Sequence, residues 1–171
     1  MVLEVGCGTG EFAKIVCSKT KYYCLDPSEK LLSIARRNIK CKSIVYVKGI
    51  AERLPFESEK FDRVYCVFAF RDFKNKVLSL REAYRVLRRG GILVILDVQG
   101  TIFGRIYSRF LRFLGRILTL GLGENPFKPF DHSVWLMKRA EYYANLAKRI
   151  GFRNVYVSSI VDILFVLVAE K

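Results

Sequence analysis

Apolar positions along the chain follow two alternating patterns, which predict strands and helices in turn. Runs that are continuously apolar, or apolar at every second position, predict strands at 2–5, 22–25, 44–47, 63–68, 92–98, 154–158 and 163–169. Apolar residues three or four positions apart predict helices at 11–18, 28–38, 74–87 and 138–150. Strands that alternate with helices predict a parallel sheet with helices on both faces.

The ends of several predicted elements carry their own signals. Ser28 is expected to cap the helix that follows it, and Gly151 to end the helix 138–150. Gly90 and Gly91 are expected to end the helix 74–87. The last two strands have no helix between them, so we expect an antiparallel hairpin at one end of the sheet. The predicted fold is α/β: a three-layer, doubly wound, seven-stranded and mostly parallel sheet with an antiparallel C-terminal strand.

The length and the first residues indicate one compact unit. A chain of 171 residues, about half of them apolar, is expected to form a single domain over 1–171 with a substantial core. Met1 runs directly into a strand pattern, without the charged region or cleavage site of a signal peptide. No uncharged apolar stretch reaches the roughly 18 residues that a spanning helix needs. We therefore expect a cytoplasmic protein.

The cysteines do not suggest a metal site. They are odd in number, form no CxxC pair and mostly have apolar neighbours, which favours reduced thiols over a disulfide or a metal centre: Cys7, Cys17, Cys24, Cys41 and Cys66. The chain has one histidine, His132, whereas zinc sites use clusters of Cys and His. We expect no metal.

The net positive charge indicates polyanionic partners but does not identify one class of them. Thirty basic residues against sixteen acidic ones give a net charge of +14. Such a field attracts polyanions, which include nucleic acid, an anionic membrane surface and a phosphorylated substrate.

The first predicted strand ends in a glycine-rich turn, VLEVGCGTGEF, with glycines at positions 6, 8 and 10. Glycine lets the backbone approach a ligand closely, and ligands of open α/β sheets bind beyond the carboxyl ends of the strands. A dinucleotide site needs GxGxxG, whereas this turn is GxGxG with Phe12 where close helix packing is required. The Glu4 carboxylate would also repel a pyrophosphate. A cofactor with an amino group and a sulfonium would meet no such repulsion.

A second motif, CLDPS, follows the second predicted strand. Its Asp26 stands twenty residues after Gly6, where an acidic side chain can accept the hydroxyls of a ribose. Alone, such a residue is more often a turn or helix-cap residue. Together with the glycine turn, its position favours ribose binding.

These two motifs resemble those of the class I S-adenosylmethionine-dependent methyltransferases. AERLPF, at 51–56, is similar to the family's adenine-contacting segment after the third strand. FDRVYCVFAFRDFKNKVLSLREAYRVLRRGGILVILDV, at 61–98, resembles the branch that methylates a ring carbon in ubiquinone and menaquinone biosynthesis. The similarity covers nearly the whole chain and is most specific up to Val98. It implies a Rossmann-like methyltransferase fold with S-adenosylmethionine as cofactor.

The resemblance assigns the first turn to the methionine part of the cofactor. Gly6, Cys7, Gly8 and Thr9 would lie along it, and Glu4 would support its amino end. Relatives also carry helices ahead of the first strand, so we expect either a more open pocket or a misplaced start. An uncovered apolar edge would favour a homodimer or another partner.

The resemblance assigns the adenosine part to later turns. Asp26 would bind the ribose hydroxyls, while Pro27 and Ala51 would flank the adenine. Ile50 stands where relatives have Asp or Asn, and Val67 stands where the quinone branch has serine. These departures predict a weaker or altered hold on the cofactor.

Methyl transfer from a sulfonium depends mainly on alignment, but a ring carbon gains from a base that removes a phenolic proton. Candidate bases are His132, Asp131 and Asp97, and Arg71 could stabilise a phenolate. The alternatives are an ordinary loop or helix-start residue for His132 and a strand-end cap for Asp97.

The segment 101–120 is basic and apolar, with no acidic residue. Arg105, Arg109, Arg112 and Arg116 are spaced four, three and four apart, which predicts one basic stripe on a helix. Within a lid-like insertion at about 100–135, this helix could lie in a membrane interface or cover a lipophilic substrate. Alternatively, its apolar side packs on the sheet and its arginines are only solvated.

We therefore expect a methyltransferase for a small, apolar or lipid-like acceptor, such as a quinone-like ring, with peripheral membrane contact through 101–120. An RNA methyltransferase is an alternative, although the fourth strand leads into CVFAF rather than an NPPY-like tetrad and no RNA-binding module is evident. A cofactor-binding scaffold without catalysis is the other alternative.

Overall fold

The computed structural model describes residues 1–17, 20–118 and 128–171, with side chains over the same ranges except at 118 and 128–131. The strands are β1 (Val2–Val5), β2 (Tyr22–Asp26), β3 (Ile44–Lys48), β4 (Phe61–Val67), β5 (Leu87–Val98), β6 (Arg153–Ile160) and β7 (Leu164–Glu170). The helices are α1 (Glu11–Val16), α2 (Glu29–Asn38), the 3₁₀ turn η1 (Phe70–Asp72), α3 (Lys76–Val86), α4 (Ile102–Leu118), α5 (Lys128–Leu136) and α6 (Ala140–Ile150).

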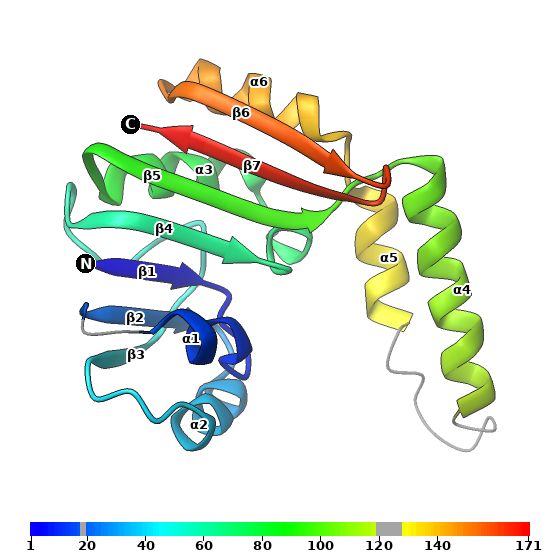
Figure 1. Ribbon diagram of the computed structural model, residues 1–171, viewed down its shortest axis with the longest axis horizontal. Coiled ribbons are helices and arrows are strands. Elements are labelled where there is room, and N and C mark those ends of the chain that lie inside the picture. Colours follow the sequence, from blue (N-terminus) through cyan, green and yellow to red (C-terminus); the bar gives the residue numbers. More distant parts are fainter. Residues whose placement is uncertain (18–19, 119–127) are drawn as a thin grey trace.

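All seven strands join one sheet, in the order β3-β2-β1-β4-β5-β7-β6 (Figure 1). Strands β1 to β5 are parallel, and β7 is antiparallel to both of its neighbours, β5 and β6. The predicted mostly parallel sheet and the terminal hairpin are confirmed. The order of the strands reverses between β1 and β4, which is where open α/β sheets bind ligands.

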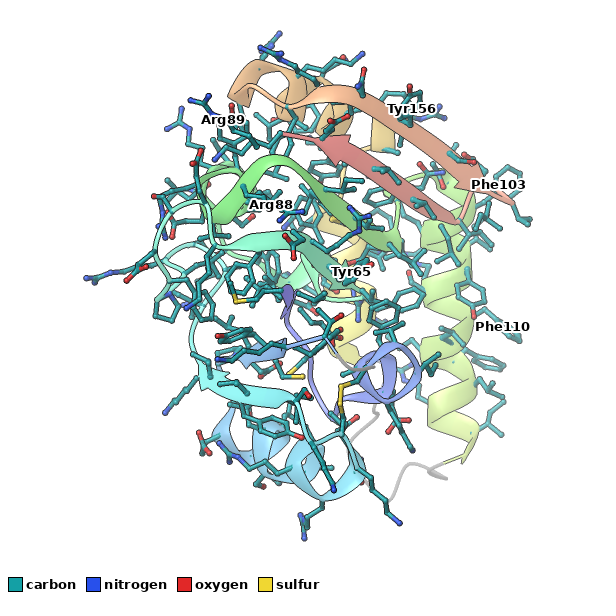
Figure 2. All side chains as sticks on the ribbon, turned by 60° about the vertical axis from the view of Figure 1, so that its left-hand side comes forward. Tyr65, Arg88, Arg89, Phe103, Phe110 and Tyr156 are labelled. Carbon is teal, nitrogen blue, oxygen red and sulfur yellow. A yellow bond between two sulfur atoms is a disulfide. The ribbon has the colours of Figure 1, made fainter. Side chains whose placement is uncertain are left out.

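The two sides of the sheet are covered unequally. On one side, Leu3 and Val5 belong to the larger core, in which α3 and α6 pack. On the other side, a smaller core beneath α1 and α2 includes Tyr22 and Leu32. Farther along this second side the apolar side chains of β4, β5 and β7 are only half-buried: Tyr65, Val94, Leu96, Val166 and Val168. Tyr65 lies on this half-covered side (Figure 2).

Two of the predicted helix ends are confirmed and one is wrong. The Ser28 hydroxyl accepts a hydrogen bond from the Leu31 N–H at 3.3 Å, and Gly151 caps the end of α6. Gly90 and Gly91 do not end α3, because the helix already stops at Val86 and both glycines lie inside β5. The strand starts earlier because Leu87 is fully buried and pairs with Phe61, ahead of a register shift in the ladder.

The expectation that every cysteine is a free thiol is wrong for one pair. Cys17 and Cys41 form a disulfide across 24 residues of sequence, while the other three cysteines are free and buried. Cys17 ends α1 and Cys41 follows α2, and α1 contacts α2. Their Cα atoms lie 6.4 Å apart, within the range that a disulfide needs. Tertiary packing brings the two cysteines together, so neither the number of cysteines nor their spacing in the sequence predicts the pair.

Residues 102–118 of the basic segment form a helix, as predicted, and α4 packs against α5. Both helices stand beyond the end of the sheet toward which β1 and β4 point (Figure 1). In addition, α5 contacts η1, the short turn that follows β4. Within the described part of the chain, no helix combines the length and the apolarity that crossing a bilayer requires.

Candidate functional site

A cleft of about 500 Å³ lies at the carboxyl ends of β1, β2, β3 and β4, within the usual range for small-molecule sites. Four turns form its walls. Its lining residues are Val5, Gly6, Gly8, Leu25, Asp26, Pro27, Ser28, Leu31, Gly49, Ile50, Ala51, Glu52, Phe68, Ala69, Asp72, Phe73 and Lys74.

The glycine turn brings bare backbone to the floor of this cleft. Gly6 and Gly8 have φ values of +78° and +54°, in the left-handed region that favours glycine. A Cβ on Gly6 would lie 2.3 Å from the Cβ of Ala69, so only glycine lets the turn approach the segment after β4. A Cβ on Gly8 would meet nothing within 4 Å, which shows that its backbone borders open space.

Asp26 braces this turn from the end of β2. The side chain is 5% exposed. Its Oδ2 accepts a hydrogen bond from the Gly8 N–H and its Oδ1 accepts one from the Ser28 N–H, both at 2.9 Å. A carboxylate offers about four lone-pair sites, so each oxygen can accept one more donor. The group can therefore accept two hydroxyls while it fixes the turn.

The charge of the cleft differs from that of the chain. Its charged lining residues are Asp26, Glu52, Asp72 and Lys74. A cleft lined mainly by one sign of charge concentrates ligands of the other sign. Although the net charge is +14, this cleft favours a cationic ligand over a polyphosphate.

The family model of the methyltransferase domain matches residues 3–95, more than half of the chain. The chain belongs to the S-adenosylmethionine-dependent methyltransferases. A demethylmenaquinone methyltransferase of Deinococcus radiodurans is 31% identical over 99% of this chain and 75% of that protein. Another, from Geobacillus stearothermophilus, is 31% identical over 91% of this chain and 71% of that protein. A ubiquinone/menaquinone biosynthesis C-methyltransferase of Allorhizobium ampelinum is 28% identical over 90% and 65%.

Solved methyltransferase structures share the fold at lower identity. A methyltransferase from Thermotoga maritima superposes with a TM-score of 0.75 at 23% identity, covering 99% of this chain and 81% of that one. A phosphoethanolamine N-methyltransferase of Haemonchus contortus, solved with S-adenosylhomocysteine, gives a TM-score of 0.76 at 17% identity over 99% and 48%. These similarities confirm the predicted Rossmann-like methyltransferase fold.

The cleft of this methyltransferase fits its cofactor chemically. S-adenosylmethionine carries a sulfonium and an amino group, both compatible with the acidic lining. Asp26 has acceptor sites left for ribose hydroxyls. Leu31, Ile50 and Ala51 supply an apolar wall suited to the adenine ring. Of the residues that the resemblance assigned to the cofactor, those that line the cleft are Gly6, Gly8, Asp26, Pro27, Ile50 and Ala51.

The other assigned residues, Glu4, Cys7, Thr9 and Val67, do not line the cleft. Glu4 points into the smaller core, where it accepts a hydrogen bond from the Tyr22 hydroxyl at 2.9 Å. Burial raises the pKa of this carboxyl to about 7, although the Tyr22 hydroxyl bond acts to lower it. Glu4 therefore lies behind the glycine turn and not in its ligand space.

The structure brings Arg71 and Asp97 together beside the cleft and places His132 on α5. The Arg71 Nη1 donates to Asp97 Oδ1 at 2.9 Å, and Asp97 also accepts the N–H groups of Arg71 and Val98 at 2.9 and 2.8 Å. Burial raises the pKa of the Asp97 carboxyl. None of the three predicted catalytic residues lines the cleft, and the His132 side chain is exposed on α5. The Asp131 side chain lies outside the described residues.

Sequence reasoning missed the wall formed after β4, where Phe68, Asp72 and Phe73 line the cleft. Phe68 has a φ of +54° and is 43% exposed. The Arg71 Nη1 donates to its carbonyl at 2.5 Å, so Arg71 ties this strained turn to Asp97. The signal that could have identified this wall is the run FAFRDF directly after a strand. In the sequence this run supported only the family resemblance.

Proposed function

We propose that this methyltransferase methylates a ring carbon of a small, lipid-like acceptor of the quinone type. The observation that carries the proposal is the aromatic wall of the cleft, made by Phe68 and Phe73. Aromatic faces and edges favour contact with another flat ring. The similarity to demethylmenaquinone methyltransferases supports the same class of acceptor.

We further propose how the chain holds its cofactor. Gly6 and Gly8 would lie along the methionine part, Asp26 would accept the ribose hydroxyls, and Pro27 and Ala51 would flank the adenine. When bound, S-adenosylmethionine supplies a methyl group on a sulfonium, which needs little further activation. The protein's task is then to orient the acceptor ring and to keep water away from it, which suits an apolar, aromatic wall.

A strained aromatic residue at this wall fits such an orienting role. Left-handed backbone is unfavourable for phenylalanine, and strain of this kind persists only where surrounding contacts impose it. Here the contact is the Arg71 bond to the Phe68 carbonyl. We propose that Arg71 and Asp97 act as positioning residues for Phe68 rather than on the acceptor itself.

Calorimetry and an activity assay test the proposal together. The acceptor is a reduced naphthoquinone that lacks the ring methyl group and carries a short prenyl chain, and the readout is the mass of the methylated product. For Asp26→Asn we expect S-adenosylmethionine to bind roughly tenfold to a hundredfold more weakly, because a charged acceptor of hydrogen bonds is lost. Glu29→Gln, on an exposed face of α2, is the matched control and should bind normally.

Three outcomes would contradict parts of this proposal. Normal cofactor binding by Asp26→Asn would remove Asp26 from the site. Methylation of RNA with no reaction of the quinol would favour the nucleic-acid alternative. Cofactor binding without turnover of either acceptor would favour a scaffold.

A further inference from the structure

Helix α4 turns a row of large apolar side chains away from the rest of the protein. The exposed members are Ile102, Phe103, Ile106, Tyr107, Phe110, Phe113 and Ile117. Phe103 and Phe110 project from α4 away from the sheet (Figure 2). Their spacing places them along one side of a helix. Exposed apolar rows of this length are uncommon on proteins that meet only water, and they mark interaction surfaces.

The opposite side of α4 packs through small residues. A Cβ on Gly104 would lie 2.4 Å from the carbonyl oxygen of Gln99, and Ser108 is fully buried. Gly115 is also buried. The helix therefore cannot rotate its apolar row inward without forcing bulky side chains into this close contact. The expected alternative, in which the apolar side packs on the sheet, is wrong.

Positive charge borders the apolar row. Residues 102–118 include four arginines and no acidic residue. The guanidinium carbons of Arg105 and Arg109 lie 4.8 and 5.2 Å from the ring centre of Trp135 on α5. Stacking on the tryptophan fixes both charges along one flank of α4.

We propose that α4 is the docking surface of this protein for an anionic phospholipid bilayer. The outward row would enter the boundary between headgroups and acyl chains, and the arginine flank would face lipid phosphates. An apolar stripe beside a basic one, on a helix without acidic residues, has the chemistry of interfacial helices. The commitment to a bilayer, and not to a second copy of the chain, rests on this charge complementarity, since a chain of net charge +14 repels its copies.

The docking surface on α4 also bears on how the acceptor reaches the cleft, a step that rests on the proposed function. Helix α5 contacts both α4 and η1, and η1 lies between the cleft residues Ala69 and Phe73. Helix α5 therefore links α4 to the proposed acceptor wall. A lipid-like acceptor could enter the cleft from the membrane in which it dissolves.

Vesicle sedimentation tests the docking surface without any need for activity. The full chain is mixed with vesicles of phosphatidylcholine alone, or of phosphatidylcholine with phosphatidylglycerol. We expect binding to the anionic vesicles, weakened by salt. The variant Phe103→Ser/Phe110→Ser should bind roughly a hundredfold more weakly, about tenfold for each lost ring. Tyr156→Ser is the matched control, because Tyr156 is 68% exposed on β6, and it should bind like the wild type.

A charge pair of variants tests the arginine flank separately. Arg109→Gln should lower the affinity for anionic vesicles severalfold, since each arginine near an anionic bilayer surface raises that affinity by about this factor. Arg89→Gln, at the other end of the sheet, should leave binding unchanged (Figure 2). Equal effects of the two would show that only net charge matters and would overturn the specific surface.

Other results would overturn the proposal outright. These are no binding to either vesicle, unchanged binding by the double phenylalanine variant, or a dimer in sedimentation equilibrium that the same variant dissociates. Failure of the proposed function is recognised independently. In that case vesicle binding persists while a short-chain quinol remains unmethylated. If both proposals are correct, the double variant methylates a water-soluble quinol normally and a vesicle-borne quinol slowly.

Discussion

Glu4 is a buried carboxyl group whose pKa lies near neutrality. Desolvation in the smaller core is the main cause, and the Tyr22 hydroxyl only partly offsets it. Burial opposes ionisation because a charge loses its hydration in an apolar environment. At neutral pH this side chain is therefore close to the point of gaining or losing a proton.

Glu4 predicts a fall in stability as pH rises toward neutrality. Between its ordinary pKa of 4.5 and about 7, the folded protein keeps a proton that the unfolded chain has released. The free energy of unfolding should therefore decrease across this window, by on the order of 3 kcal/mol in total. Glu4→Gln should remove that decrease, and urea unfolding at about pH 5 and about pH 8 measures it. Glu29→Gln, an exposed control, should keep the wild-type slope, and an unchanged slope in Glu4→Gln would contradict the assignment.

The Asp97 carboxylate is fully buried, and the stability of the fold depends on its pairing with Arg71. Arg71→Met leaves the Asp97 charge buried beside backbone donors alone, so we expect a loss of about 3 to 5 kcal/mol in the free energy of unfolding. Adding Asp97→Asn should restore part of that loss, because the uncharged amide no longer needs a cation. A double-mutant cycle by urea denaturation measures the coupling. Strictly additive single effects would show that the pair does not interact energetically.

Single residues were predictable where the chemistry is local. Ser28 caps the helix that begins directly after it, and Asp26 reaches the glycine turn because parallel strands end at one edge of the sheet. The strained backbone of Phe68 was not predictable. It depends on Arg71 and Asp97, whose meeting requires β4 and β5 to be adjacent.

At the level of elements, the disulfide joins the two helices of the smaller core. A cross-link that spans 24 residues should stabilise the fold by about 3 kcal/mol, mainly by restricting the unfolded chain. We expect Cys17→Ser/Cys41→Ser to unfold at a lower temperature than the wild type. Reductant should lower the melting temperature of the wild type and leave that of the variant unchanged. Titration of five thiols in the denatured, unreduced protein would contradict the disulfide.

Sequence periodicity predicted most elements but not how α4 is oriented. A helix with an apolar stripe usually buries it, and the spacing of residues 101–120 fits either orientation. The deciding residues are Gly104 and Ser108, whose small side chains permit close packing on the opposite side. This orientation depends on the positions of Gln99 and α5 beside these two residues, which the sequence does not give.

At the scale of the whole molecule, the basic helix α4 and the acidic cleft lie on different parts of the fold. The strongly basic composition predicted polyanionic partners, yet the charged residues that line the cleft are mainly acidic. Composition sums over the whole chain, so it could not show that α4 carries four arginines and no acidic residue while Asp26, Glu52 and Asp72 gather at the strand ends.

The position of β7 between β5 and β6 has a consequence for synthesis on the ribosome. Strand β6 leaves the ribosome before β7, yet β7 is its neighbour in the sheet. Until Leu164–Glu170 emerges, β6 lacks its neighbour in the sheet and β5 keeps an open edge. Unpaired strand edges recruit other chains. The nascent protein is thus most vulnerable to misassociation just before its last strand closes the gap between two strands made earlier.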